Sequence, residues 1–347
     1  MANKTKAAFS KGVNFSKWFE SRSVQDIQFS RFVDQDFANV KSIGGDVIRL
    51  PIAVHDFTLG EPDYILDPTL IKYLDTTVDW AEKHGLYIIL DNHSFHPVNP
   101  TDVNIDKILL PVWTQLAGHF KNRSDYVLYE ILNEPHHISD ERWGEIQGAA
   151  IDTIRRIDKR HTIIAGGTDY NSIEKLASIP PYADNNLIYT FHFYDPHIFT
   201  HQGATWEIPS LASLSGVPFP VEKSRMPETP ADLKGTWVEN ALRNYEKDAA
   251  LETLNATLDK ASDFSKERGV PVFCGEFGVL MIQSPPSDRV KWYEFICGAL
   301  NKRSIPWTSW DYFGGFGIFK TGRKGDFNTD VNAGVIRAMG FTPPALA

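Results

Sequence analysis

The chain has 347 residues, and 42% of them are hydrophobic, which is enough for one sizeable core. The formal net charge is −9, which argues against nucleic acid or an anionic membrane as a partner. No stretch is apolar over the length that spans a bilayer, and the first ten residues, MANKTKAAFS, lack the apolar core of a signal peptide. We expect a monomer that is secreted after removal of a leader; a cytoplasmic protein is the alternative.

Eight short apolar runs recur along the chain, each followed by a helical or loop segment. They cover residues 9–16, 46–53, 86–94, 127–135, 161–168, 187–194, 271–278 and 306–313. Continuous apolar runs with helical crossovers are typical of parallel strands, and eight such units close into a barrel. An open doubly wound sheet is the alternative, but it normally has a glycine-rich turn after its first strand, and GVNFS is not one. We therefore predict an α/β fold, a single (β/α)8 TIM barrel over residues 1–347.

Helices with apolar residues at helical spacing are expected between these runs. They cover residues 32–43, 68–84, 108–120, 141–158, 247–268, 288–302 and 333–339. Residues 195–245 break the pattern, because they are rich in Pro, Ser and Gly and show no clear helix. We expect a long loop insertion after the sixth strand, at the rim where barrel active sites lie. A loop that only packs on the barrel is the alternative.

Polar and aromatic side chains gather at the C-terminal ends of the predicted strands. They are Arg49, His93, Asn133, Glu134, His192, Tyr194, Glu276 and Trp310. Glu134 and Glu276 lie at the ends of the fourth and seventh predicted strands. Two carboxyl groups are the smallest set of catalytic groups with which glycosidases commonly hydrolyse a glycosidic bond. In a retaining enzyme one carboxyl group protonates the leaving oxygen and the other attacks the anomeric carbon.

The neighbours of this carboxyl pair suit the same chemistry. A cation such as Arg49 lowers the pKa of a nearby carboxyl group and keeps it ionised. His192 and Tyr194 are two residues apart on one strand, so they point to the same face. Asn133 can bond a sugar hydroxyl, and the ring of Trp310 offers an apolar surface for the C–H face of a pyranose.

Six short motifs in order along the chain resemble glycoside hydrolase family 5, the cellulase-type family of clan A barrels. They are IRLP, DNH, LNEP, HFY, GEFG and the tryptophan of the eighth strand. The resemblance implies that Glu134 is the general acid/base and Glu276 the nucleophile. It implies that the polar and aromatic residues named above surround the sugar at the point of cleavage. It also implies retaining, endo-acting hydrolysis of β-1,4-glucans without a cofactor.

Several alternatives remain open. Mixed-linkage glucan, xyloglucan or mannan can be the substrate, the action can be exo, and a carbohydrate-binding barrel without catalysis is possible. Trp18, just beyond the first strand, is our candidate for a further sugar platform. The aromatic residues that are candidates to line a groove are Trp18, Phe19, Trp206, Trp237, Phe313 and Phe316. Trp113 and Trp292 lie in predicted helices, where we expect them to be packing residues.

No metal is expected, although the chain has 11 histidines. A metal-dependent barrel hydrolase would usually carry a His-x-His pair on its first strand, and GVNFS has no histidine. Asp326 to Asp330 resembles half of a calcium loop but lacks the glycine and the closing glutamate. Cys274 and Cys297 fall in a predicted strand and helix, so we expect two buried free thiols.

Overall fold

All eight predicted strands are present, and they close into one parallel barrel. The computed structural model describes residues 6–94, 96 and 98–344. In it each strand pairs with the next, and the last pairs with the first. The strands are β1 (Lys11–Asn14), β2 (Val47–Ile52), β3 (Tyr87–Asn92), β4 (Val127–Glu130), β5 (Thr162–Gly166), β6 (Leu187–Phe193), β7 (Val272–Phe277) and β8 (Trp307–Ser309). The (β/α)8 prediction is confirmed.

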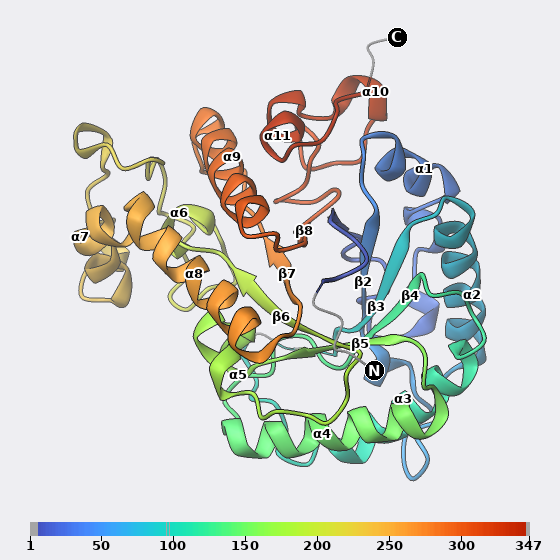
Figure 1. Cartoon of the computed structure of the whole chain (residues 1–347). Helices are drawn as coiled ribbons and strands as arrows, with labels where there is room; N and C mark the ends of the chain where they lie inside the picture. The colour runs from blue at the N-terminus through green and yellow to red at the C-terminus, as the bar shows by residue number, and fades with distance from the viewer. Residues whose placement is uncertain (1–5, 95, 97, 345–347) are drawn as a thin grey trace.

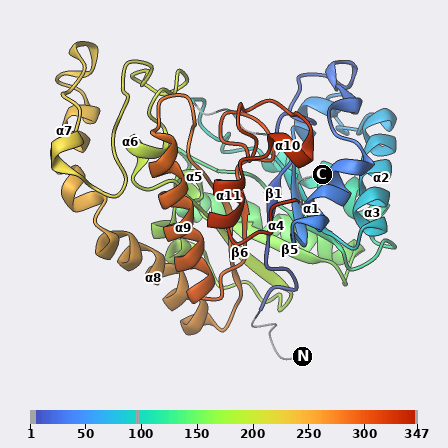
Figure 2. The ribbon, with the colours of Figure 1, turned by 90° about the horizontal axis from the view of Figure 1, so that it is seen from above.

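Helices surround the strands, as two perpendicular views show (Figures 1 and 2). The longer ones are α1 (Asp34–Ser42), α2 (Pro68–Lys83), α3 (Asp106–Phe120), α4 (Asp140–Ile157), α8 (Leu251–Arg268), α9 (Pro286–Lys302) and α11 (Ala333–Ala338). Their ends follow the expected local chemistry. Asp67 caps α2 by accepting a hydrogen bond from the backbone N–H of Thr69, and Gly269 ends α8 at a φ of 64°. In the described part of the chain, no helix combines the length and the apolar character that crossing a membrane requires.

The insertion after β6 is confirmed, but the expectation that it contains no helix was wrong. It holds a short helix, α6 (His197–Thr200), and the three-turn helix α7 (Trp237–Asp248). Thr236 caps α7, and Val238, Leu242 and Tyr245 form its buried face. Ala241 packs on the same core, so a helical spacing is present in the sequence but covers only a short segment. The prediction missed it because a long stretch rich in Pro, Ser and Gly precedes it.

Two layers fill the barrel interior. The lower layer is an apolar cluster to which six strands and the N-terminal segment contribute. Its members are Phe9, Val47, Ile89, Leu128, Ile164, Ile188 and Phe273. Side chains two residues further along a strand point the same way. The next inward residues on β2, β3 and β4 are therefore Arg49, Asp91 and Glu130, which form a charged layer above the apolar floor.

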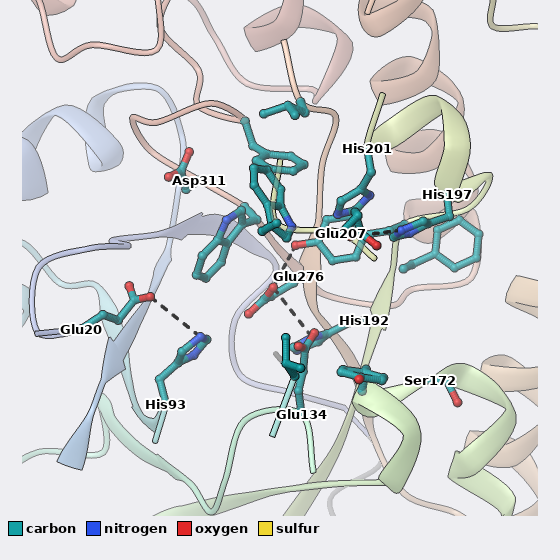
Figure 3. A pocket seen from close by; sticks show the side chains of 18 of the residues that line it. Glu20, His93, Glu134, Ser172, His192, His197, His201, Glu207, Glu276 and Asp311 are labelled. Carbon is teal, nitrogen blue, oxygen red and sulfur yellow. Dashed lines mark hydrogen bonds and ion pairs between the residues drawn. The ribbon is translucent and has the colours of Figure 1, made fainter. Parts of the chain in front are cut away.

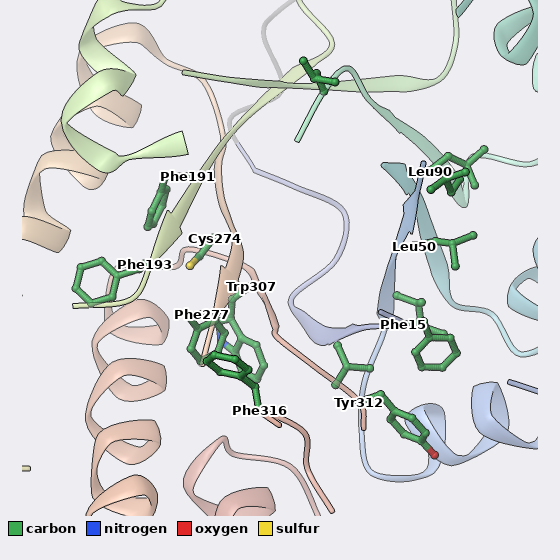
Figure 4. Packing of buried hydrophobic residues seen from close by; sticks show 14 of the residues in the cluster. Phe15, Leu50, Leu90, Phe191, Phe193, Cys274, Phe277, Trp307, Tyr312 and Phe316 are labelled. Carbon is green, nitrogen blue, oxygen red and sulfur yellow. The ribbon is translucent and has the colours of Figure 1, made fainter. Parts of the chain in front are cut away.

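A second apolar core lies between the strands and the helices. Figure 4 shows part of it, with Phe191 and Phe193 on one side of the barrel and Phe15 and Leu50 on the other. Trp113, Trp292 and both free cysteines are buried in this core, as predicted. The two cores pack on opposite faces of the strands and so hold in place the strand ends that carry the site residues.

Candidate active site

Glu134 and Glu276 meet at the C-terminal rim of the barrel. One carboxylate oxygen of each and one ring nitrogen of His192 all lie within 4.8 Å of one another. Nδ1 of His192 is 2.6 Å from Oε1 of Glu134 and 3.8 Å from Oε2 of Glu276. These groups line a cavity of about 1040 Å³. Figure 3 shows both carboxylates pointing into this cavity.

Glu276 reaches this position because β7 contains a bulge. Phe191 on β6 pairs with Cys274, but the next residue, His192, pairs with Glu276, so Gly275 has no partner in the register. A Cβ atom on Gly275 would lie 2.8 Å from Oγ1 of Thr190 and 3.0 Å from Nε2 of His192. The bulge therefore needs glycine, and it brings the nucleophile candidate level with His192.

We expect Gly275→Ala to lower kcat, by up to about a hundredfold, because the new methyl group must displace the side chains of Thr190 and His192, and His192 holds Glu134. Gly298→Ala is the matched control, since nothing lies within 4 Å of its added Cβ atom on helix α9. Steady-state kinetics on a soluble substrate measure both variants. Equal loss in the two variants would contradict the role of the bulge.

Arg49 connects the charged layer to the site. It is fully buried, and its guanidinium donates to Glu276 at 2.6 Å, to Glu130 at 2.8 Å and 2.9 Å, and to Asn133 at 2.8 Å. Asp91 lies 2.9 Å from the same group. Glu130 and Asp91 are therefore buried acids that pair with Arg49 and do not line the cavity.

The pKa of Glu276 is lowered by its surroundings. Burial raises this pKa, but the positive charges of His192, Arg49 and His93 and a hydrogen bond from Tyr194 outweigh burial. The Tyr194 hydroxyl donates to Oε2 of Glu276 at 2.8 Å. Glu276 is therefore an ionised carboxylate at neutral pH, held by donors on both oxygens.

Glu134 sits on a strained piece of backbone. Its φ is 46°, in the left-handed region that non-glycine residues rarely adopt. Strain of this kind persists where the surroundings fix it, and it clusters at functional sites. This backbone conformation points the carboxylate of Glu134 at Nδ1 of His192. The other ring nitrogen of His192, Nε2, is buried and has no hydrogen-bond partner in the described structure. Of the two ring nitrogens of His192, Nδ1 is therefore the one that donates a hydrogen bond, and Glu134 accepts it.

His93 and Trp310 form the opposite wall of the cavity, with their rings stacked at 5.6 Å between centroids. Burial lowers the pKa of His93, but Asp91, 2.7 Å from Nδ1, and Glu20 outweigh it and raise the pKa to about 9. Oε1 of Glu20 lies 3.9 Å from Nε2 of His93. The sequence analysis missed Glu20, because it follows β1 by six residues on a loop and carries no strand-end signal.

We expect His93 to make the stability of the protein depend on pH. Its pKa of about 9 lies above the ordinary 6.5, so its stabilisation is complete below pH 6.5 and is lost as the pH rises through 9. This difference in pKa corresponds to about 3 kcal/mol. Thermal unfolding between about pH 6 and about pH 10 should show a steeper fall in Tm for the wild type than for His93→Gln. Parallel falls would count against this account.

Trp18 is not a sugar platform, in contrast to our expectation. Its side chain is 1% exposed, packs on Phe19 and Phe32, and donates its indole N–H to the carbonyl of Phe29. The segment after β1 runs beside the end of β2, and Phe29, Phe32 and Trp80 cover the Trp18 ring. Of the other aromatic candidates for a groove, Trp206, which is 47% exposed, and Phe316 line the cavity. Phe19, Trp237 and Phe313 do not line it, and Phe19 and Phe313 are buried.

Comparison with known proteins gives consistent matches along the chain. The chain is 30% identical to endoglucanase 3 of Fibrobacter succinogenes over 90% of its own length, and it spans about half (51%) of that relative. It is 28% identical to endoglucanase C of Acetivibrio thermocellus, over 88% of this chain and 91% of the relative.

The fold also matches a solved structure. Crystal structures of Thermotoga maritima Cel5A in complex with mannotriose superpose with a TM-score of 0.77 at 26% identity, covering 95% of this chain and 97% of that one. The sequence model of the cellulase family, glycosyl hydrolase family 5, matches residues 5–314. This match covers nearly the whole chain and includes both carboxylates of the cavity. The chain belongs to glycosyl hydrolase family 5.

Proposed function

We propose that this chain is an endo-β-1,4-glucanase that cleaves cellulose-type β-glucans with retention of configuration. The observation that carries the proposal is the separation of at most 4.8 Å between oxygens of Glu134 and Glu276. Retaining enzymes hold their two carboxyl groups about 5–5.5 Å apart, whereas inverting enzymes leave about 6.5–9.5 Å for a water molecule. The two relatives described above are both named endoglucanases.

In this mechanism Glu276 is the nucleophile. Its ionised carboxylate attacks the anomeric carbon as the glycosidic C–O bond breaks, and the leaving oxygen takes the proton of Glu134. The product of this step is a glycosyl ester on Glu276. Glu134, now a carboxylate, takes a proton from water, whose oxygen attacks the same carbon and releases Glu276. Tyr194 and Arg49 hold Glu276 in line for both displacements.

The remaining cavity residues are proposed to bind the sugar. Trp310, stacked on His93, supplies a flat apolar wall, and Asn133 supplies an amide beside Arg49. A polysaccharide substrate is too large to enter a cell, so secretion remains our expectation, as does a monomeric state. One domain over residues 1–347 also remains a prediction.

A second candidate substrate is β-mannan. The Thermotoga maritima structure at 26% identity holds mannotriose, so a cavity of this fold admits the axial 2-hydroxyl of mannose. Mixed-linkage glucan and xyloglucan are further candidates, and xyloglucan needs room for its branches.

Release of reducing ends from carboxymethylcellulose, lichenan, xyloglucan and mannan tests the proposal. We expect the highest rate on the β-1,4-glucan, a rapid fall in viscosity that marks endo cleavage, and the β-anomer as the first product by proton NMR. Glu276→Gln is the inactive control. Initial release of the α-anomer would overturn the retaining mechanism. Oligosaccharide binding without any hydrolysis would favour a carbohydrate-binding barrel instead.

A further inference from the structure

Three side chains with metal-binding atoms meet in the wall of the cavity, apart from the catalytic pair. His197 and His201 lie four residues apart at the two ends of α6, and Glu207 follows on the next turn of the insertion. One ligand atom of each lies within 4.8 Å of the others. Figure 3 shows His197 facing Glu207, with His201 beside them. We propose that His197, His201 and Glu207 form a binding site for a divalent transition-metal ion, with Zn²⁺ as the preferred ion.

The spacing of the donor atoms fits such an ion. Zn²⁺ binds imidazole nitrogen and carboxylate oxygen at about 2.0–2.2 Å, so two ligands of a tetrahedral ion lie about 3.3–3.6 Å apart. Nε2 of His197 is 3.4 Å from Oε1 of Glu207. The rings of His197 and His201 stack at 4.0 Å between centroids, so both imidazoles are on one side of the helical turn. The two stacked rings must rotate about their side-chain bonds for their nitrogens to reach one ion together with the Glu207 oxygen.

His201 is prepared as a ligand by its neighbour Thr200. The Thr200 hydroxyl has one proton, which it gives to the carbonyl oxygen of Tyr194 at 2.6 Å. It can therefore only accept from Nδ1 of His201, which lies 3.0 Å away. The proton of His201 is on Nδ1, and Nε2 keeps a free electron pair.

Glu207 lies in a hydrogen-bonded loop, residues 201–211, that brings it close to the two histidines. The N–H of Ala204 donates to the carbonyl of His201, and the N–H groups of Gly203 and Leu211 close the turn across it. Gly203 has a φ of 87°, and a Cβ atom there would lie 2.6 Å from the side chain of Gln283. The loop that carries Glu207 is therefore closed between Gly203 and Leu211, and at Gly203 it lies against the side chain of Gln283.

The ligand set indicates the class of ion. Two imidazoles and one carboxylate suit zinc and its transition-metal neighbours, whereas calcium and magnesium prefer oxygen ligands. Three protein ligands leave one position of a tetrahedral ion open toward the cavity. His201 also contacts Tyr194, at 5.0 Å between ring centroids, and Tyr194 holds Glu276. An ion at this site shares the cavity with the sugar, so, given the proposed function, ion and oligosaccharide should weaken each other's binding equally.

Calorimetric titration of the chelator-treated full chain with zinc chloride tests the site. We expect one equivalent of Zn²⁺ to bind, and His197→Phe and Glu207→Gln each to weaken binding at least about tenfold, since each removes a ligand. His119→Asn is the matched control, because His119 makes a surface pair with Asp75 at 2.8 Å. The control should bind zinc as the wild type does. Zinc binding that is absent from the wild type, or unchanged in both ligand variants, would overturn the proposal.

The catalytic pair is the competing location, because Glu134, His192 and Glu276 also bring three donors together. Glu276→Gln should bind zinc as strongly as the wild type, because His197, His201 and Glu207 are unchanged in it. If it loses zinc binding while His197→Phe keeps it, the ion lies at the catalytic pair and the proposal fails. Cobalt gives a second measurement: Co²⁺ should show the visible absorption bands of a tetrahedral site in the wild type and lose them in Glu207→Gln. None of these measurements requires turnover, so they remain decisive even if the proposed hydrolysis fails.

Discussion

Replacing Glu276 with glutamine is expected to lower kcat by about 10⁴-fold or more, because an amide cannot form the glycosyl ester. Glutamine keeps the size of the side chain and its hydrogen bond with Tyr194, so the fold should remain intact. Circular dichroism and thermal unfolding provide the check on folding. Full activity of Glu276→Gln on an unactivated polysaccharide would refute the nucleophile assignment.

A small anion distinguishes the two carboxylates more sharply than loss of activity does. In Glu276→Gly, azide can enter the vacated space, attack the anomeric carbon of an aryl β-cellobioside and expel the aryloxide. The product is then the α-glycosyl azide. In Glu134→Ala, the glycosyl ester on Glu276 still forms from an activated aryl substrate, and azide attacking that ester gives the β-glycosyl azide. NMR of the two azides therefore assigns each role, and the reverse pattern would exchange the roles of Glu134 and Glu276.

The sequence carried most of the information on the barrel. Each strand of β2 to β7 is buried on both faces, so its apolar run is continuous and easy to detect. The strand ends also identified the two carboxylates that meet in the cavity, because parallel strands of a closed barrel present their C-terminal ends at one rim. The same reasoning placed His192 and Tyr194 on one face, where they now contact Glu134 and Glu276.

Features that depend on loops were not predictable in this way. Glu20 comes close to His93 because the loop after β1 runs beside the end of β2, and Trp18 on the same loop is buried against the helices. The bulge at Gly275 depends on strand register, which a single strand sequence does not contain. The expectation of no metal weighed the histidines, including His197 and His201, against a first strand without histidine. No sequence pattern indicates that Glu207 comes close to these two histidines through the turn at Gly203.

Arg49→Met should have the largest effect on stability, because it leaves Asp91, Glu130 and Glu276 buried without their shared cation. Breaking a buried ion pair by removing one partner costs about 3–5 kcal/mol, and here one cation serves three carboxylates. Chemical denaturation measures this free energy of unfolding. Arg123→Met is the control, since Arg123 is partly exposed beside Asp79 and Glu82 and should lose about 1 kcal/mol or less.

Arg49→Lys separates the electrostatic role of Arg49 from its packing. Lysine keeps the positive charge, but a compact ammonium group cannot donate to three carboxylates in a fork. Because the charge of Arg49 lowers the pKa of Glu276, removing it in Arg49→Met should raise that pKa. Glu276 then takes up a proton at a higher pH. The acid limb of the pH profile of kcat/KM therefore moves to higher pH. Arg49→Lys should show a smaller shift in the same direction. If Arg49→Met folds and keeps the acid limb of the wild type, the charge of Arg49 does not hold Glu276 ionised, and His192 and His93 must do so alone.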